Sequence, residues 1–200
     1  MKKKLLTILV LMIPFFALAQ KGSYMLKLVK VENDDISTGR ITIDSIKPSK
    51  LIIYVGKYTD SLISASLQWG YSSINFELTN VSRKAIKINW NEAAYINYDN
   101  NTGKIMHLGV KYIDRNNEQP STTIISQAKI SDGATPTNNV YYANGSYGGW
   151  RTNTILPSVG KKDEKLLVGK KVKLLLPIVS DSKQINYVFT FEIMFNEYIK

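Results

Sequence analysis

The densest group of residues suited to molecular recognition lies at residues 141–150, which read YYANGSYGGW. This segment holds four aromatic residues and three glycines, and an arginine follows it directly. Glycines permit sharp turns, and exposed aromatic and arginine side chains are enriched among residues that dominate binding energy. We therefore expect a loop that contacts a sugar ring or a partner protein. The expected contact residues are Tyr142, Tyr147, Trp150 and Arg151.

A structural role is the competing interpretation of the same segment. In that interpretation Tyr141 and Trp150 end two strands, and the aromatic rings cover one end of the domain. The two interpretations differ in whether the rings face a ligand or the rest of the chain.

Residue types that commonly carry catalysis are sparse. The chain has no cysteine and a single histidine, His107, which excludes thiolate zinc sites, iron–sulfur clusters and multi-histidine metal centres. No Gly-x-Ser-x-Gly elbow accompanies the serines. Glu92 follows a tryptophan where a strand turns into a loop, and it is the most notable carboxylate. We expect no catalytic residue, no metal and no cofactor; the alternative is a hydrolase of the cell envelope with a site near Glu92 or His107.

Alternation of apolar and polar residues with period two runs through much of the chain and indicates strands. β-branched and aromatic residues, which strands prefer, dominate these stretches, and no convincing amphipathic helix is present. Phe76 and Trp90 are expected in the core. The alternating stretches are residues 63–69, 74–79, 86–90, 106–112 and 187–195.

Turn-forming residues separate these stretches. Residues 80–84 predict a hairpin between two strands, residues 99–103 predict another in which Gly103 adopts positive φ, and residues 180–183 connect the last pair. Asn80, Asn100 and Asn144 lie in Asn-x-Ser/Thr sequences and are interpreted as turn asparagines. The spacing of strands and turns predicts an all-β protein, an antiparallel immunoglobulin-like β-sandwich.

The N-terminal part of the chain divides into a leader and an additional β segment. Residues 1–19 join three lysines, an apolar run and a small-residue ending, which is the layout of a secretory signal peptide. Residues 20–58 predict an N-terminal β segment or arm, with strands near Leu26, Ile41 and Val55, and residues 59–200 predict the sandwich domain. The leader predicts an exported protein, periplasmic or extracellular, with no transmembrane segment in the mature chain. Since no cysteine follows the apolar run, we expect that the protein is not a lipoprotein.

The basic charge does not point to nucleic acid. The formal net charge of +10 includes the three lysines of the leader, so the remaining chain carries +7. Its lysines and arginines are scattered, and no recognisable nucleic-acid-binding module is present. Nucleic acid is therefore not expected as a partner.

One part of the chain resembles small exported bacterial domains. Residues 76–80 (FELTN), followed by Ser82 and residues 86–90 (IKINW), are similar to the strand–Asn–turn–strand unit of the FxLYD and LEA14-like (WHy) groups. The resemblance to uncharacterised exported proteins covers residues 58–195, although the Tyr-Asp ending of the FxLYD group is missing after Leu78. Further segments that carry it are residues 90–95, 106–112 and 141–150. The resemblance implies an immunoglobulin-like sandwich at the cell envelope and no particular activity.

These observations favour a non-enzymatic function. We expect an exported β-sandwich that acts as a binding or structural module of the bacterial cell envelope. The expected partner is an unknown envelope protein or a glycan.

Overall fold

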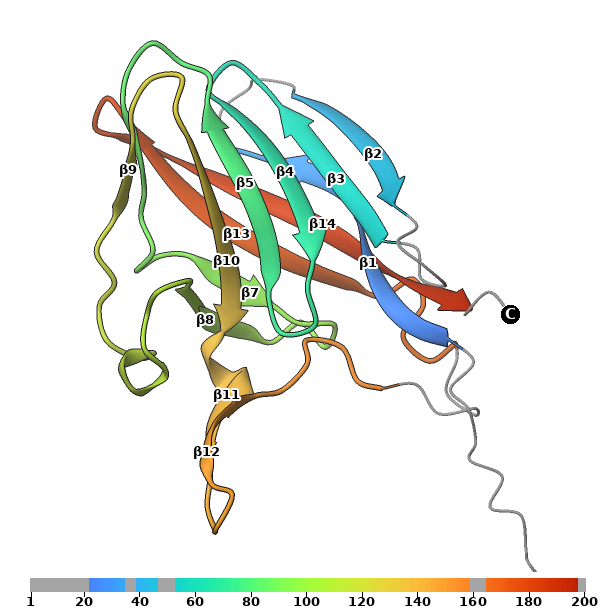
Figure 1. Ribbon diagram of the computed structural model, residues 1–200. Coiled ribbons are helices and arrows are strands. Elements are labelled where there is room, and N and C mark those ends of the chain that lie inside the picture. The colour runs from blue at the N-terminus through green and yellow to red at the C-terminus, as the bar shows by residue number, and fades with distance from the viewer. Residues whose placement is uncertain (1–21, 35–38, 47–52, 159–164, 198–200) are drawn as a thin grey trace, which may run out of the picture.

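The computed structural model of the 200-residue chain describes residues 22–34, 39–46, 53–158 and 165–197 (Figure 1). Helical structure in this part of the chain is limited to two 3-10 turns, η1 (Tyr112–Asp114) and η2 (Thr137–Asn139). A membrane-crossing helix, long and apolar enough for a bilayer, is not found among these residues. The predicted signal peptide, residues 1–19, lies outside the described residues.

Fourteen strands make up the rest of the regular structure in the described ranges. The first seven are β1 (Gly22–Glu32), β2 (Arg40–Ile46), β3 (Ile53–Thr59), β4 (Ile63–Trp69), β5 (Ile74–Asn80), β6 (Ile86–Ile88) and β7 (Ala94–Ile96). The others are β8 (Thr102–His107), β9 (Thr122–Ile124), β10 (Lys129–Pro136), β11 (Val140–Ala143), β12 (Gly149–Thr152), β13 (Lys171–Ser180) and β14 (Lys183–Glu197).

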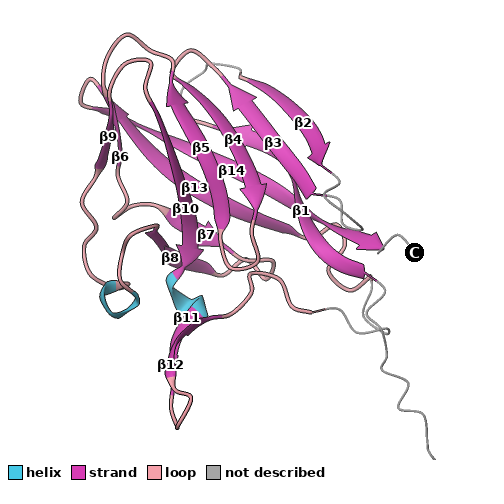
Figure 2. Cartoon of the chain, viewed as in Figure 1, coloured by secondary structure: helices cyan, strands magenta, loops and turns pink. Residues whose placement is uncertain are grey.

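Twelve of the strands form one nearly closed antiparallel sheet in two layers. The order is β1-β14-β13-β7-β8-β10-β5-β4-β3-β2, with β6 joined to β13 and β9 to β6. β2, β3, β4, β5 and β10 form one layer, β1, β14 and β13 form the other, and β7 and β8 connect them (Figure 2). β11 and β12 form a separate two-stranded sheet. The all-β, antiparallel prediction is confirmed.

The described strands of residues 20–58 pair with both layers. β1 runs antiparallel to β14 from Gly22 to Glu32, with one bulge between Leu28 and Lys30. β2 pairs with β3, and β3 pairs with β4. Tyr24 and Leu26 of β1 belong to the same hydrophobic core as the later strands.

Alternation places one face of each central strand in the core. Buried residues alternate with less buried ones along β4 and β5, because successive side chains of a strand point to opposite faces. Phe76 and Trp90, predicted in the core, are 4% and 1% exposed, and their ring centroids lie 6.2 Å apart.

The alternation predicted through residues 106–112 is wrong beyond His107. β8 ends at His107, Gly109 adopts a φ of 92°, and η1 follows. Met106 is buried, whereas Leu108 is exposed. Glycine adopts positive φ without steric cost, so a turn ends the strand although the apolar pattern continues.

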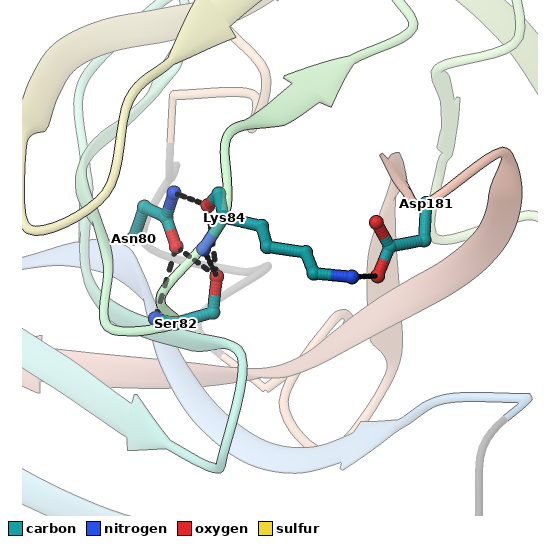
Figure 3. Close-up of polar contacts among 4 residues, drawn as sticks. All are labelled: Asn80, Ser82, Lys84 and Asp181. Carbon is teal, nitrogen blue, oxygen red and sulfur yellow. Dashed lines mark hydrogen bonds and ion pairs between the residues drawn. The ribbon is translucent and has the colours of Figure 1, made fainter.

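Residues 80–84 do not form the predicted hairpin. They lead from β5 to β6, which pairs with β13 and β9 rather than with β5. Asn80 is fully buried and holds this connection (Figure 3). Its Nδ2 donates to the carbonyl oxygens of Lys84 (2.7 Å) and Ile124 (3.0 Å), and its Oδ1 accepts the backbone N–H and the hydroxyl of Ser82. Asn80 is thus a turn asparagine, as predicted.

The other two predicted connections are hairpins. A hairpin joins β7 to β8, but its loop is residues 97–101, because Thr102 and Gly103 of the predicted turn already belong to β8; the left-handed residue is Asn100, with a φ of 64°. Asp181 and Ser182 join β13 to β14 with φ values of 50° and 64°. Two successive residues with positive φ are typical of the type I′ turn, whose twist matches that of the strands.

Candidate functional site

The segment predicted to contact a ligand forms the β11–β12 hairpin, which projects from the body of the molecule (Figure 1). Tyr142 lies opposite Trp150 in the register, and Tyr141 lies opposite Arg151. Since opposite residues share a face, Tyr142 and Trp150 lie on one face of the hairpin, and Tyr141 and Arg151 lie on the other.

Glycines and a hydrogen bond shape the tip of the hairpin. Gly145 and Gly149 adopt φ values of 109° and 147°, which only glycine adopts readily. The N–H of Gly148 donates to the carbonyl oxygen of Gly145 over 2.8 Å. Nη2 of Arg151 donates to the carbonyl oxygen of Tyr147 over 2.9 Å, so the guanidinium braces the tip.

A cluster of rings and one guanidinium forms around Trp150. The ring centroids of Tyr142 and Trp150 lie 5.5 Å apart in an edge-on arrangement, and those of Tyr112 and Trp150 lie 6.4 Å apart. The guanidinium of Arg115 lies 5.0 Å above the centroid of Trp150, within range of a cation–π contact. We call this cluster of Tyr112, Arg115, Tyr142 and Trp150, together with Tyr147 at the tip of the same hairpin, the hairpin patch.

The aromatic residues of the hairpin patch are exposed. Tyr147 at the tip is 91% exposed, Tyr142 is 57% exposed and Trp150 is 36% exposed. Burial of a large aromatic ring away from water is favourable. The flat faces of such rings pack on sugar rings or on apolar side chains of a protein. Physically, the patch offers a preformed aromatic contact area with a cationic edge.

The sequence identified part of this patch. Tyr142, Tyr147 and Trp150 are exposed, as a contact surface requires, whereas Arg151 contacts the backbone of the tip. Tyr112 and Arg115 were missed because they lie in η1 and directly after it, and they reach Trp150 only through the fold. The one available signal was their own pairing, an aromatic and a basic residue three apart in a polar segment.

His107, a residue of the alternative hydrolase site, is packed into the core edge. Its ring stacks on Trp90 at a centroid distance of 4.6 Å and an angle of 12°. Nδ1 lies 3.3 Å from Oδ2 of Asp132, within ion-pair distance but without hydrogen-bond alignment to any described residue. Oδ1 of Asp132 accepts the backbone N–H groups of Leu108 and Gly133. This carboxylate therefore ties the turn after β8 to β10.

Glu92, the other residue of that alternative, belongs to a different network. Its Oε2 accepts a hydrogen bond from Nε2 of Gln184 over 2.6 Å, and Gln184 also contacts Asn89 and Asn186. None of the contacts among the described residues joins Glu92 to His107. The two side chains do not form one catalytic cluster.

Metal-ligating residues do not gather in the described part of the chain. No group of three or more His, Asp or Glu side chains is positioned there to hold an ion. Asp99, in an oxygen-rich turn, forms an ion pair with Lys170 at 3.3 Å. Comparison with protein-family models, curated proteins and solved structures finds no significant match to the chain.

Proposed function

We propose that the protein is an exported, non-enzymatic binding module of the bacterial cell envelope and that the hairpin patch is its contact surface. The observation that carries this proposal is the exposure of the patch rings Tyr142, Tyr147 and Trp150 on one projecting hairpin, with Tyr147 at 91%. The partner is an envelope protein or a glycan. Export is supported by the leader-like residues 1–19.

The hairpin is preorganised, which favours binding because less conformational entropy is lost on association. Paired strands, the glycine turn and the hydrogen bond from Arg151 to the backbone of Tyr147 hold the tip before any partner arrives. Binding by a preorganised surface loses less conformational freedom. Tyr, Trp and Arg, the residue types found here, are also the types most often responsible for binding energy.

We propose an immunoglobulin-like sandwich as the finer description of the fold. Two facing layers of antiparallel strands support it, as does the strand–Asn–turn–strand unit at residues 76–90, which resembles that of the FxLYD and LEA14-like groups. In such sandwiches the loops and hairpins at the ends carry recognition while the layers serve as a scaffold.

The test compares Tyr147→Ala and Trp150→Ala with the unaltered protein on a glycan array and against purified envelope fractions. We expect each substitution to weaken binding at least tenfold, because truncation of a central aromatic contact typically costs about 2 kcal/mol or more. The matched control is Tyr71→Ala, which removes a 65% exposed ring remote in sequence from the hairpin. The melting temperature of each variant separates lost binding from lost folding. Unchanged binding per folded molecule in both hairpin variants would refute the proposal.

A further inference from the structure

The edge of β2 that faces away from β3 has no strand partner in the described part of the chain. β2 is the last strand in the order of the large sheet, and its register with β3 runs without a shift from Arg40 to Ile46. It is also the outermost strand of its layer in Figure 1, beyond the place where Gly56 of β3 packs against Leu28 of β1. The outer N–H and C=O groups of β2 are therefore available to a further strand.

β1, at the other end of the sheet, has features that oppose such pairing, and β2 lacks them. A bulge interrupts β1 between Leu28 and Lys30, and Lys27 and Lys30 place two positive charges along it. Bulges and lysines are common means by which proteins block an edge strand. β2 contains no lysine, no proline and no register shift. Of the two ends of the sheet, β2 is thus the one suited to pairing.

The two charges of β2 are placed so that a second copy of the strand complements the first. When two copies pair antiparallel with Thr42 opposite Thr42, Arg40 of each copy lies opposite Asp44 of the other. In the same arrangement Ile41 lies opposite Ile43. Opposite charges directly across a pair of strands are stabilising, and like charges are destabilising. The sequence of β2 is therefore complementary to itself.

Other registers of the same two strands lack this match. Ile41 and Ile43 pack against the core, and the residues that alternate with them are exposed. A shift of one residue would place these isoleucines opposite polar side chains. A shift of two residues places either Arg40 or Asp44 opposite Thr42, and a shift of four places like charges opposite each other. The register centred on Thr42 alone pairs both charges and both apolar positions.

The guanidinium of Arg40 is free to make this contact. It has no ion-pair partner among the described residues, whereas Oδ2 of Asp44 lies 2.6 Å from Nζ of Lys57. A carboxylate has two oxygens and accepts several hydrogen bonds, so Asp44 can keep Lys57 and also accept from Arg40 of the second copy. Exposed ion pairs add little stability, but they select the register in which strands meet.

We propose that the protein forms a symmetric dimer in which two copies of β2 pair antiparallel about Thr42 and join two large sheets into one. Such a contact uses the same edge of both copies, so the assembly closes at two chains. The seam is small compared with the roughly 1,200–2,000 Å² of a stable interface, so we expect a Kd on the order of 100 µM. This inference goes beyond the proposed function and does not depend on the hairpin patch, none of whose residues lies on β2.

The first experiment is analytical ultracentrifugation of the purified protein from about 5 µM to about 500 µM, a range that brackets the expected Kd. Arg40→Asp and Asp44→Arg each place like charges opposite one another in a dimer of the variant, so each should weaken association about tenfold. An equimolar mixture of the two variants restores both opposite-charge pairs and should associate as strongly as the unaltered protein. Lys30→Asp makes the same change of charge as Arg40→Asp but on β1, and it should leave association unchanged.

The second experiment locates the symmetry axis with an introduced thiol, since the chain contains no cysteine. Thr42→Cys brings two thiols directly opposite each other in the dimer, within reach of a disulfide, so oxidation with diamide should give a covalent dimer. Ser45→Cys is the matched control on the same strand. It separates the two thiols by about 20 Å and should give no covalent dimer.

Sedimentation as a monomer at every concentration would overturn the proposal, and a strand from a different protein would then be the occupant to seek for this edge. Unchanged association of both charge variants, or no recovery of association in their mixture, would also overturn it. The same holds for equal cross-linking of Thr42→Cys and Ser45→Cys. The melting temperature of each variant separates lost association from lost folding, and recovery in the mixture requires both variants to be folded.

Discussion

Tyr58 and Tyr95 are buried phenols that the fold keeps neutral. Burial, with a hydrogen bond to Asp60 and its negative charge, raises the pKa of Tyr58 above 10.0; the hydroxyl donates to Oδ2 of Asp60 over 2.9 Å. Burial is also the main cause of the raised pKa of Tyr95. At each position the folded protein therefore binds a proton more tightly than the unfolded chain does.

This difference predicts alkaline unfolding. A raised folded-state pKa gives stability that is fully present below about pH 10 and is lost as the pH rises above the unfolded value. Each tyrosine contributes a slope of up to about 1.4 kcal/mol per pH unit in that range. Urea unfolding between pH 9 and 11.5 should show a smaller slope for the Tyr58→Phe, Tyr95→Phe double variant. An identical slope would contradict the assignment.

Trp90 joins several core contacts in one side chain. It is 1% exposed, packs beside Phe76, stacks on His107, and donates from Nε1 to Oγ1 of Thr122 over 2.8 Å. Truncation of a buried tryptophan costs about 3–5 kcal/mol, so Trp90→Ala should lower the melting temperature by roughly 10 °C. Differential scanning calorimetry measures this shift. Trp90→Phe keeps part of the ring and should lose less, and a shift of only one or two degrees for Trp90→Ala would contradict its role in the core.

At the scale of elements, long-range contacts explain why the hairpin predicted at residues 80–84 does not form. Asn80 and Ser82 have the composition of a hairpin turn, yet their hydrogen bonds reach Lys84 and Ile124 and direct the chain into β6. The strand after the turn pairs with β13, roughly ninety residues later, and this long-range pairing has no local signal. The same reason explains why Tyr112 and Arg115 were missed at the hairpin patch.

Asn80 should be critical for the connection between β5 and β6. Asn80→Ala removes hydrogen bonds to two carbonyl groups, one N–H and one hydroxyl in a fully buried site. Since an unsatisfied buried group costs about 1–3 kcal/mol, we expect a loss of about 3 kcal/mol in urea unfolding.

Asp181→Asn is the matched control for Asn80→Ala. It breaks the exposed ion pair between Lys84 and Asp181, 2.8 Å long, beside the same turn (Figure 3). An exposed pair contributes little, so this change should stay within about 0.5 kcal/mol. Similar losses for the two variants would mean that the amide of Asn80 has no special role.

At the scale of the whole molecule, period-two alternation was sufficient for the fold class but not for the arrangement of strands. β4, β5 and β14 were recognised because one face of each is buried in a common core. The pairing of β1 with β14 joins the two ends of the described chain, and it depends on side chains too distant in sequence to be read together. Alternation identifies which face of a strand is apolar, whereas partner and layer follow from packing.

We expect the protein to be exported and to act outside the cytoplasm. Residues 1–19 carry three lysines, an apolar run and a small-residue ending, the features that export machinery and signal peptidase recognise. We expect the exported protein to begin at Gln20 or within a few residues of it, just before β1 starts at Gly22. Mass spectrometry of protein recovered from the periplasm or the medium measures the new N-terminus. Recovery of exported protein with Met1 intact would contradict cleavage, and retention in the cytoplasm would remove the basis for an envelope partner.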